Sequence, residues 1–171
     1  MLAILDNDNN LRKHSLTNLV DNPNFNISNV LFCDKEFVTQ AINHPNEFII
    51  IDARPRARFH GTEPEPRNNL VSGHIPNSIN IPFERLIKNG KFIEKNEIYH
   101  IFDSLKIKKN SKIIFTCGSG VTACILAVAS RIIGYNNTYV YDGSWSEWGK
   151  IGSNNLIETY SSSEKTSFEN A

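Results

Sequence analysis

The sequence predicts an α/β fold, with an open, mainly parallel sheet of about five strands and helices on both faces. Short apolar runs of strand length alternate along the chain with longer amphipathic or apolar segments of helical length. The central strand-like runs are almost wholly apolar, as expected for strands buried on both faces of a parallel sheet. With 171 residues, the chain has room for one domain and a tail.

Five segments are expected to be strands because they are short and mainly apolar. The clearest is Glu47-Phe-Ile-Ile-Ile51, which ends at Asp52. The run from Lys112 to Thr116 is similar and leads directly into a cysteine. The five predicted strands are residues 30–32, 47–51, 78–81, 112–116 and 138–141.

Four segments are expected to be helices, and residues 83–87 one further helical turn. Residues 94–105 carry their apolar side chains on one helical face. Residues 121–133 are apolar nearly all round, so this helix is expected to be buried. Asp34 is expected to cap the first helix, and Gly134 follows the third, where a helix commonly ends. The four predicted helices are residues 34–42, 94–105, 121–133 and 144–149.

The rest of the chain is polar or irregular. Residues 53–77 carry most of the prolines and are expected to form a long irregular connection. Residues 1–29 are interpreted as a linker or N-terminal arm, and residues 151–171 as a polar C-terminal tail. The domain itself is therefore predicted to span residues 30–150.

Charge and cysteine content exclude several classes of protein. The 18 basic side chains equal the 18 acidic ones, which argues against broad nucleic-acid binding, and no apolar run approaches membrane-spanning length. The three cysteines, Cys33, Cys117 and Cys124, cannot all pair and form no CxxC motif, so a zinc site is not expected. We expect a cytoplasmic protein with no metal ion and no cofactor, in which Cys33 and Cys124 are core residues.

The segment that carries chemistry is the loop after the predicted strand 112–116. Cys117 is followed by Gly118-Ser119-Gly120 and then by an apolar helix. The glycines let successive backbone N–H groups turn toward one point, and the positive end of the helix adds to their field. Such a cradle stabilises a thiolate or a persulfide anion on Cys117. The alternative is a buried cysteine with only a structural role.

Two other chemistries use a strand, a loop and a helix in this order. A cysteine phosphatase needs an arginine six residues after the cysteine to clamp phosphate, and Ala123 stands there. The run from Gly118 to Ala123 also fits the G-x-G-x-x-A pattern of dinucleotide binding, with Asp142 ending the next strand. However, the match falls near the C-terminus, and too little chain follows it to build the rest of such a fold.

A second group of polar residues leaves the end of the predicted strand 47–51. Asp52 is followed by Arg54, Arg56, Arg58 and Arg67, on a loop stiffened by prolines. Because this loop starts at the carboxyl end of a strand, it can reach the same sheet edge as the cysteine, and two arginines suit a bidentate grip on a carboxylate or another small oxyanion.

A purely structural interpretation exists for several of these residues. Arg54 and Arg56 could belong to a solvated surface loop with ion pairs to Glu63 and Glu65, and Asp52 could anchor that loop. His74 could act as a general base, but its Gly and Pro neighbours favour a structural turn. Trp145 and Trp148 could wall a pocket, although packing of the last helix explains them as well.

Taken together, Asp52-Ala-Arg54, Gly73-His-Ile-Pro76 and the cysteine loop resemble a rhodanese domain. A finer match is to the catalytic domain of the 3-mercaptopyruvate sulfurtransferase family. It is carried by Arg58-Phe-His-Gly-Thr-Glu-Pro-Glu-Pro-Arg67, by Cys117-Gly-Ser-Gly-Val-Thr-Ala123 and by Tyr141-Asp-Gly-Ser-Trp-Ser-Glu-Trp-Gly149. The resemblance covers roughly residues 30–149 and implies a rhodanese-like fold.

The resemblance also implies a chemistry. Cys117 would be the nucleophile that becomes a persulfide and passes its outer sulfur to a thiol or to cyanide. Ser119 would assist proton transfer, and Arg58 and Arg67 would hold the oxygens of mercaptopyruvate. Thiosulfate-specific relatives carry basic residues in the loop, whereas this loop is neutral, which favours mercaptopyruvate as the donor. The loop backbone that surrounds the sulfur would come from Gly118, Gly120, Val121 and Thr122.

Members of this family join two such domains, with the active site between them, and the first domain supplies an Asp and a His for the loop serine. The resemblance therefore leaves three hypotheses. The chain could be an active sulfurtransferase, alone, self-associated or with a separate N-terminal rhodanese domain. It could instead be a persulfide carrier that receives sulfur from another protein, or an inactive half-enzyme or binding module. A thioredoxin-like thiol would be a suitable acceptor, and neither nucleic acid nor a membrane is expected as a partner.

Overall fold

A computed structural model describes residues 31–159. Within these residues, five strands form one sheet in the order β1-β7-β6-β2-β3, and every neighbouring pair is parallel. The α/β prediction is confirmed. The predicted arm at residues 1–29 lies outside the described residues. The strands are β1 (Leu31–Cys33), β2 (Phe48–Asp52), β3 (Ser78–Asn80), β6 (Lys112–Thr116) and β7 (Thr138–Tyr141).

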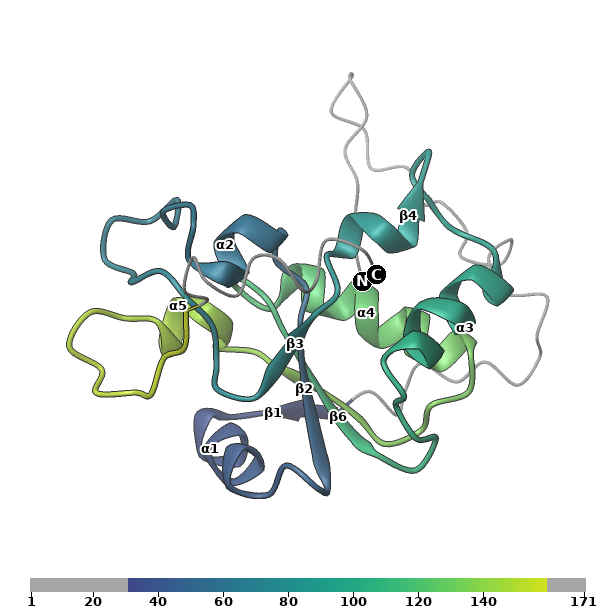
Figure 1. Cartoon of the computed structure of the whole chain (residues 1–171), viewed down its shortest axis with the longest axis horizontal. Coiled ribbons are helices and arrows are strands. Elements are labelled where there is room, and N and C mark those ends of the chain that lie inside the picture. Colours follow the sequence, from purple (N-terminus) through teal and green to yellow (C-terminus); the bar gives the residue numbers. More distant parts are fainter. Residues whose placement is uncertain (1–30, 160–171) are drawn as a thin grey trace, which may run out of the picture.

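Helices cover both faces of the sheet, as predicted. Figure 1 shows α1 on one side of the strands and α3 and α4 on the other. Asp34 caps α1, where its Oδ1 accepts the N–H of Phe37 at 2.9 Å. Gly134 follows α4 with φ of +90°, a backbone conformation that glycine adopts without strain. The helices are α1 (Lys35–Asn43), α2 (Arg56–His60), α3 (Lys95–Ser104), α4 (Val121–Ile132), α5 (Ser144–Trp148) and the 3₁₀-helix η3 (Phe83–Leu86).

The two faces of the sheet are built by the alternation of side chains along each strand. Ile51, Ile113 and Phe115 point into the cluster that α3 and α4 complete. Ile50 and Ile114, one position away, point into a second cluster, which α1 and α5 complete. Both central strands are therefore buried on both faces, which explains why the residues between their ends are apolar.

Two local predictions were wrong, and one pair of strands was missed. The stretch 53–77 is not wholly irregular, because α2 (Arg56–His60) forms within it. A short antiparallel hairpin of β4 (Ile87–Lys88) and β5 (Lys91–Phe92) was not expected. The helix α4 is not buried all round either, since 62% of Val121, its first residue, is exposed.

The described part of the predicted tail lies against the domain. Glu158 and His74 exchange two backbone hydrogen bonds of 2.8 and 3.0 Å. The indole Nε1 of Trp148 donates to the carbonyl of Leu156 at 2.9 Å. Residues 151–159 thus pack on the domain, and residues 160–171 lie outside the described part. None of the helices described is both long and apolar enough to span a bilayer.

Candidate active site

Strand register brings the two predicted groups of polar residues to one edge of the sheet. Asp52, the last residue of β2, is paired with Thr116, the last residue of β6. The residue that follows β6 is Cys117, and the chain leaving β2 leads through Arg54 into α2, which carries Arg58. In parallel sheets, ligands bind at this carboxyl edge, so the juxtaposition marks a candidate active site.

The Cys117 loop is held by backbone hydrogen bonds from α5. The carbonyl of Cys117 accepts the N–H of Trp145 at 3.0 Å, and the carbonyl of Gly118 accepts the N–H of Ser146 at 2.9 Å. The N–H of Cys117 donates to the hydroxyl of Ser144 at 3.2 Å, and that hydroxyl donates to the carbonyl of Tyr141 at 2.8 Å. The loop is therefore fixed through its main chain rather than its side chains.

This bracing sets the direction of the loop's own N–H groups. In a trans peptide, the carbonyl and the following N–H point in opposite directions, and the described residues contain no cis bond. Because the carbonyls of Cys117 and Gly118 face α5, the N–H groups of Gly118 and Ser119 point away from it. Gly120 then turns the chain into α4 with φ of +82°. The result is a set of amide donors beside the cysteine, at the positive end of α4.

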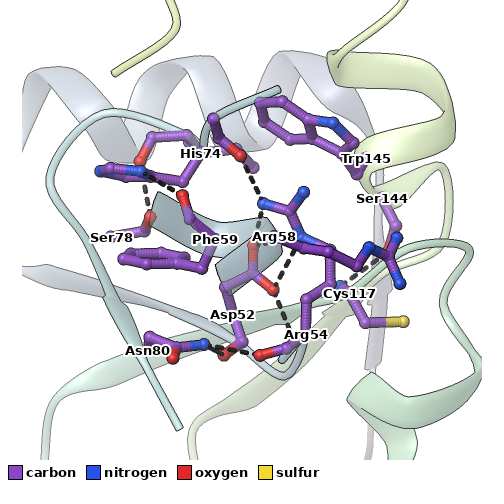
Figure 2. A network of polar contacts seen from close by, with 12 residues as sticks. Asp52, Arg54, Arg58, Phe59, His74, Ser78, Asn80, Cys117, Ser144 and Trp145 are labelled. Atoms are coloured by element: carbon purple, nitrogen blue, oxygen red, sulfur yellow. Dashed lines mark hydrogen bonds and ion pairs between the residues drawn. The ribbon is translucent and has the colours of Figure 1, made fainter. Parts of the chain in front are cut away.

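Arg54 forms the buried centre of the second group. Its side chain is 1% exposed, and it pairs with the carboxylate of Asp52 at 2.7 Å and with that of Glu65 at 2.8 Å. It also donates to the carbonyl of Gly73 at 2.7 Å and lies 4.3 Å from the ring centre of Trp145. Figure 2 shows Arg54 between Asp52 and Trp145. The solvated-loop interpretation is thus wrong for Arg54, although its predicted ion pair with Glu65 is confirmed.

Arg58 joins this buried group to the cysteine loop. Its Nε donates to Oε1 of Glu65 at 3.1 Å, and its Nη2 pairs with Oε2 of the same carboxylate. The hydrogen bond to Glu65 raises the pKa of Arg58, and the negative charges of Glu65, Asp52 and Cys117 raise it further against the opposing effect of burial. Arg58 is consequently a permanent cation beside the thiol.

The guanidinium of Arg58 also lies against the loop glycine. A Cβ atom added to Gly118 would come within 3.2 Å of Nη2 of Arg58. In Figure 2 the Arg58 side chain extends toward Cys117. A cation, a set of amide donors and a thiol that is 2% exposed therefore meet at one point, which suits attack by sulfur on an anionic substrate.

Comparison with known families agrees with this geometry. The family model described as the rhodanese-like domain matches residues 35–151. The chain belongs to the rhodanese-like family. Over 102 residues, this rhodanese-like chain is 44% identical to the 3-mercaptopyruvate sulfurtransferase of Homo sapiens, and over 103 residues it is 42% identical to the thiosulfate sulfurtransferase of Gallus gallus.

These relatives are much longer than the matched part. The aligned residues are 59% and 60% of this chain but 34% and 35% of the two relatives, so the chain spans about a third of their length. Among solved structures, the 3-mercaptopyruvate sulfotransferase SseA from Escherichia coli is similar with a TM-score of 0.57 and 37% identity. That likeness covers 68% of this chain and 43% of SseA.

Not all predicted site residues of the rhodanese-like domain lie equally deep. Cys117 is buried and Arg58 is partly buried, whereas Ser119 and Arg67 are exposed. Gly120 is buried, and Gly118 and Thr122 are partly exposed. The structure therefore brings Arg58 and Cys117 together. The catalytic roles of Cys117 and Ser119 and the substrate-binding roles of Arg58 and Arg67 stay predictions.

Residues with an expected structural role behave as such. His74 is buried, its Nδ1 lies 2.8 Å from the carbonyl of Phe59, and its ring stacks on that of Phe59. Trp145 and Trp148 are 1% and 2% exposed and pack in the core. The packing interpretation of both tryptophans is confirmed. His74 has structural contacts, as expected, but it forms a β-bridge with Glu158 rather than part of a turn.

The other two cysteines are partly buried and pack against the core clusters. Burial, assisted by the charge of Asp34, raises the pKa of Cys33 to about 12. Burial also raises the pKa of Cys124, whose Sγ donates to the carbonyl of Gly120 at 3.4 Å. Neither thiol is therefore prepared to act as a nucleophile. Within residues 31–159, no group of three or more His, Cys, Asp or Glu side chains could hold a metal ion.

Two residues of the site had no site role in the sequence analysis. Ser144 belongs to a quoted motif, but only its hydrogen bond to the N–H of Cys117 reveals what it does. Glu65 was considered only as a surface partner of arginine, yet its side chain is fully buried. Its place between Pro64 and Pro66, with arginines on either side in the sequence, was the available signal.

Proposed function

We propose that the chain is a sulfurtransferase that takes sulfur from 3-mercaptopyruvate and delivers it to a thiol or to cyanide. The observation that carries the proposal is the contact of the Arg58 guanidinium with the loop of Cys117. Family membership and identity to a 3-mercaptopyruvate sulfurtransferase support the reaction type. The chain is almost equally identical to a thiosulfate sulfurtransferase. The proposal of mercaptopyruvate rather than thiosulfate as the sulfur donor therefore rests on the absence of basic residues from the Gly-Ser-Gly loop.

In the first step, the Cys117 thiolate attacks the sulfur of mercaptopyruvate. The new bond is S–S, and the bond that breaks joins carbon 3 to that sulfur. The electron pair passes into the enolate of pyruvate, which is then protonated. Arg58 holds the substrate carboxylate or keto oxygen, and the loop amides stabilise the persulfide anion on Cys117.

In the second step, the acceptor attacks the outer sulfur of the persulfide. A thiolate becomes a persulfide, or cyanide becomes thiocyanate. The S–S bond to Cys117 breaks, and the thiolate of Cys117 is restored with its electron pair. This step needs no redox cofactor, because the outer sulfur of the persulfide passes from Cys117 to the acceptor without a net change in its oxidation state.

The partners belong to the same proposal. Because the family that the chain resembles builds its active site between two such domains, we propose that this domain acts together with a second copy or with another rhodanese domain. The acceptor would be a small thiol or a thioredoxin-like protein. A carrier that receives its sulfur from another protein is the competing possibility.

The test is formation of pyruvate and thiocyanate by the purified chain from mercaptopyruvate and cyanide. We expect turnover that is faster with mercaptopyruvate than with thiosulfate and is abolished by Cys117→Ser. Cys124→Ser is the matched control, because that thiol lies outside the proposed mechanism, and it should keep most of the activity. Absence of a Cys117 persulfide with either donor would contradict the enzyme proposal, and its formation only after a second rhodanese domain is added would identify a half-enzyme.

A further inference from the structure

The charges beside Cys117 are balanced within a single cluster. Two carboxylates, Asp52 and Glu65, face two guanidinium groups, Arg54 and Arg58. Three of these four side chains are at most 1% exposed, and only Arg58, at 22%, reaches solvent. Arg58 therefore does not present an unbalanced positive charge to a substrate.

Glu65 is the carboxylate that balances the charge of Arg58, the member of the cluster that lies against the Cys117 loop. Its Oε1 accepts from both Arg54 and Arg58, and its Oε2 accepts from Arg58 alone. The Nε edge of Arg58 is thus occupied by a carboxylate. The hydrogen-bonding capacity that remains, chiefly on Nη1, can hold one end of an anion, but the net charge behind it is close to zero.

We propose that Glu65 is a specificity-determining residue that makes this site accept a monoanionic carboxylate and disfavour a dianion such as thiosulfate. The inference rests on the proposed function and deepens it. The neutral Gly-Ser-Gly loop adds no cation, and a Cβ at position 118 would already crowd Arg58. Of the two guanidinium groups in the cluster, that of Arg58 lies against the loop, and Glu65 balances its charge.

The physical reason is that electrostatic energy scales with the charge of the ligand. A change of one unit in the net charge of the cluster alters the binding of a dianion twice as much, in free energy, as that of a monoanion. If Glu65→Gln strengthens the binding of a monoanion about tenfold, it strengthens that of a dianion about a hundredfold. The ratio of the two affinities should therefore shift about tenfold toward the dianion. A purely structural loss would weaken both anions alike.

The experiment measures occupancy of the site without turnover. Alkylation of Cys117 by iodoacetamide is followed by mass spectrometry of its peptide, in the presence of pyruvate as the monoanion or sulfate as the dianion, at constant ionic strength. Each anion gives a half-protecting concentration. For the full wild-type chain we expect pyruvate to protect at a lower concentration than sulfate.

Glu65→Gln should lower the half-protecting concentration of sulfate about tenfold more than that of pyruvate. Glu63→Gln is the matched control, because Glu63 is exposed on the same loop, and its ratio should stay at the wild-type value. Glu65→Asp retains the charge and should also keep the wild-type ratio. An unchanged ratio in Glu65→Gln, or an equal shift in Glu63→Gln, overturns the proposal.

Folding of each variant is checked by its thermal melt. If Glu65→Gln does not fold, the test depends on the half-protecting concentrations of the wild-type chain. The proposal is overturned if sulfate protects Cys117 at a lower concentration than pyruvate does, or if neither anion protects it. Because alkylation needs no sulfur transfer, these outcomes are distinct from failure of the proposed function, which is absence of a persulfide with every donor.

Discussion

Two segments meet beside the cysteine and are held in opposite ways. The loop from Cys117 to Gly120 is fixed by main-chain hydrogen bonds from α5 and contains no Asp, Glu, Lys or Arg. The segment from Asp52 to Glu65 is fixed by side-chain ion pairs around the buried Arg54. The loop should therefore be sensitive to backbone conformation and to added volume. The arginine-bearing segment should instead be sensitive to charge, and the variants below test this difference.

The largest effect is expected from Arg54→Met. This change leaves the carboxylates of Asp52 and Glu65 buried without their shared partner, and breaking a buried pair in this way costs about 3–5 kcal/mol of unfolding free energy. Urea unfolding measures it. Arg56→Met, on the exposed side of α2, should change stability by less than about 0.5 kcal/mol. Equal effects of the two changes would contradict the buried ion-pair account.

Among single changes in the loop, Gly120→Ala should lower the free energy of unfolding the most, as measured by urea unfolding. It places a side chain at φ of +82° and brings the new Cβ within 3.0 Å of the carbonyl oxygen of Asp142. The left-handed conformation alone costs about 1–2 kcal/mol, and the close approach adds to it. Gly90→Ala is the control, because Gly90 has a similar φ of +73° with open space around it. If Gly120→Ala lowers the unfolding free energy no more than Gly90→Ala does, the contact between the new Cβ and the carbonyl oxygen of Asp142 costs no stability.

The stability of the chain should also depend on pH through His74, which packs against Phe59 of the arginine-bearing segment. Burial lowers the pKa of His74, so the folded chain favours the neutral ring, whereas the unfolded chain takes up a proton near pH 6.5. Stability should therefore fall as the pH drops below about 6.5. Urea midpoints between pH 5 and 8 measure this dependence. Burial also lowers the pKa of His60, so His74→Asn should reduce this dependence without removing it. His100→Asn, at an exposed position of α3, should leave it unchanged.

Gly118→Ala is expected to have the smallest effect on stability. No positive φ is required there, and the nearest atom is the flexible end of Arg58, 3.2 Å from the added Cβ. Unfolding free energy should change by less than about 1 kcal/mol. Protection of Cys117 by pyruvate should nevertheless weaken several-fold, because the guanidinium is displaced. If protection is unchanged, Arg58 does not hold the anion.

The sequence was informative wherever a feature depends on local order or apolar pattern. The buried strands around Ile50 and Ile114, the Asp34 cap and the place of Cys117 after β6 follow from such patterns. The burial of Glu65 could not be predicted from such patterns. It depends on ion pairs with Arg54 and Arg58, which lie seven or more residues earlier in the chain and meet Glu65 only in the folded structure. The hairpin of β4 and β5 was also missed, because its strands are only two residues long.

The central claim is that Arg58 holds the sulfur donor for Cys117. It is tested most directly by the single-turnover rate at which mercaptopyruvate forms the Cys117 persulfide, followed by rapid quench and mass spectrometry. Because a hydrogen bond to a charged group contributes about 1.5–3 kcal/mol, Arg58→Gln should slow this step by roughly 10- to 100-fold, whereas Arg56→Gln should leave it unchanged. A persulfide that forms at the same rate in Arg58→Gln and in the wild-type chain would contradict the account.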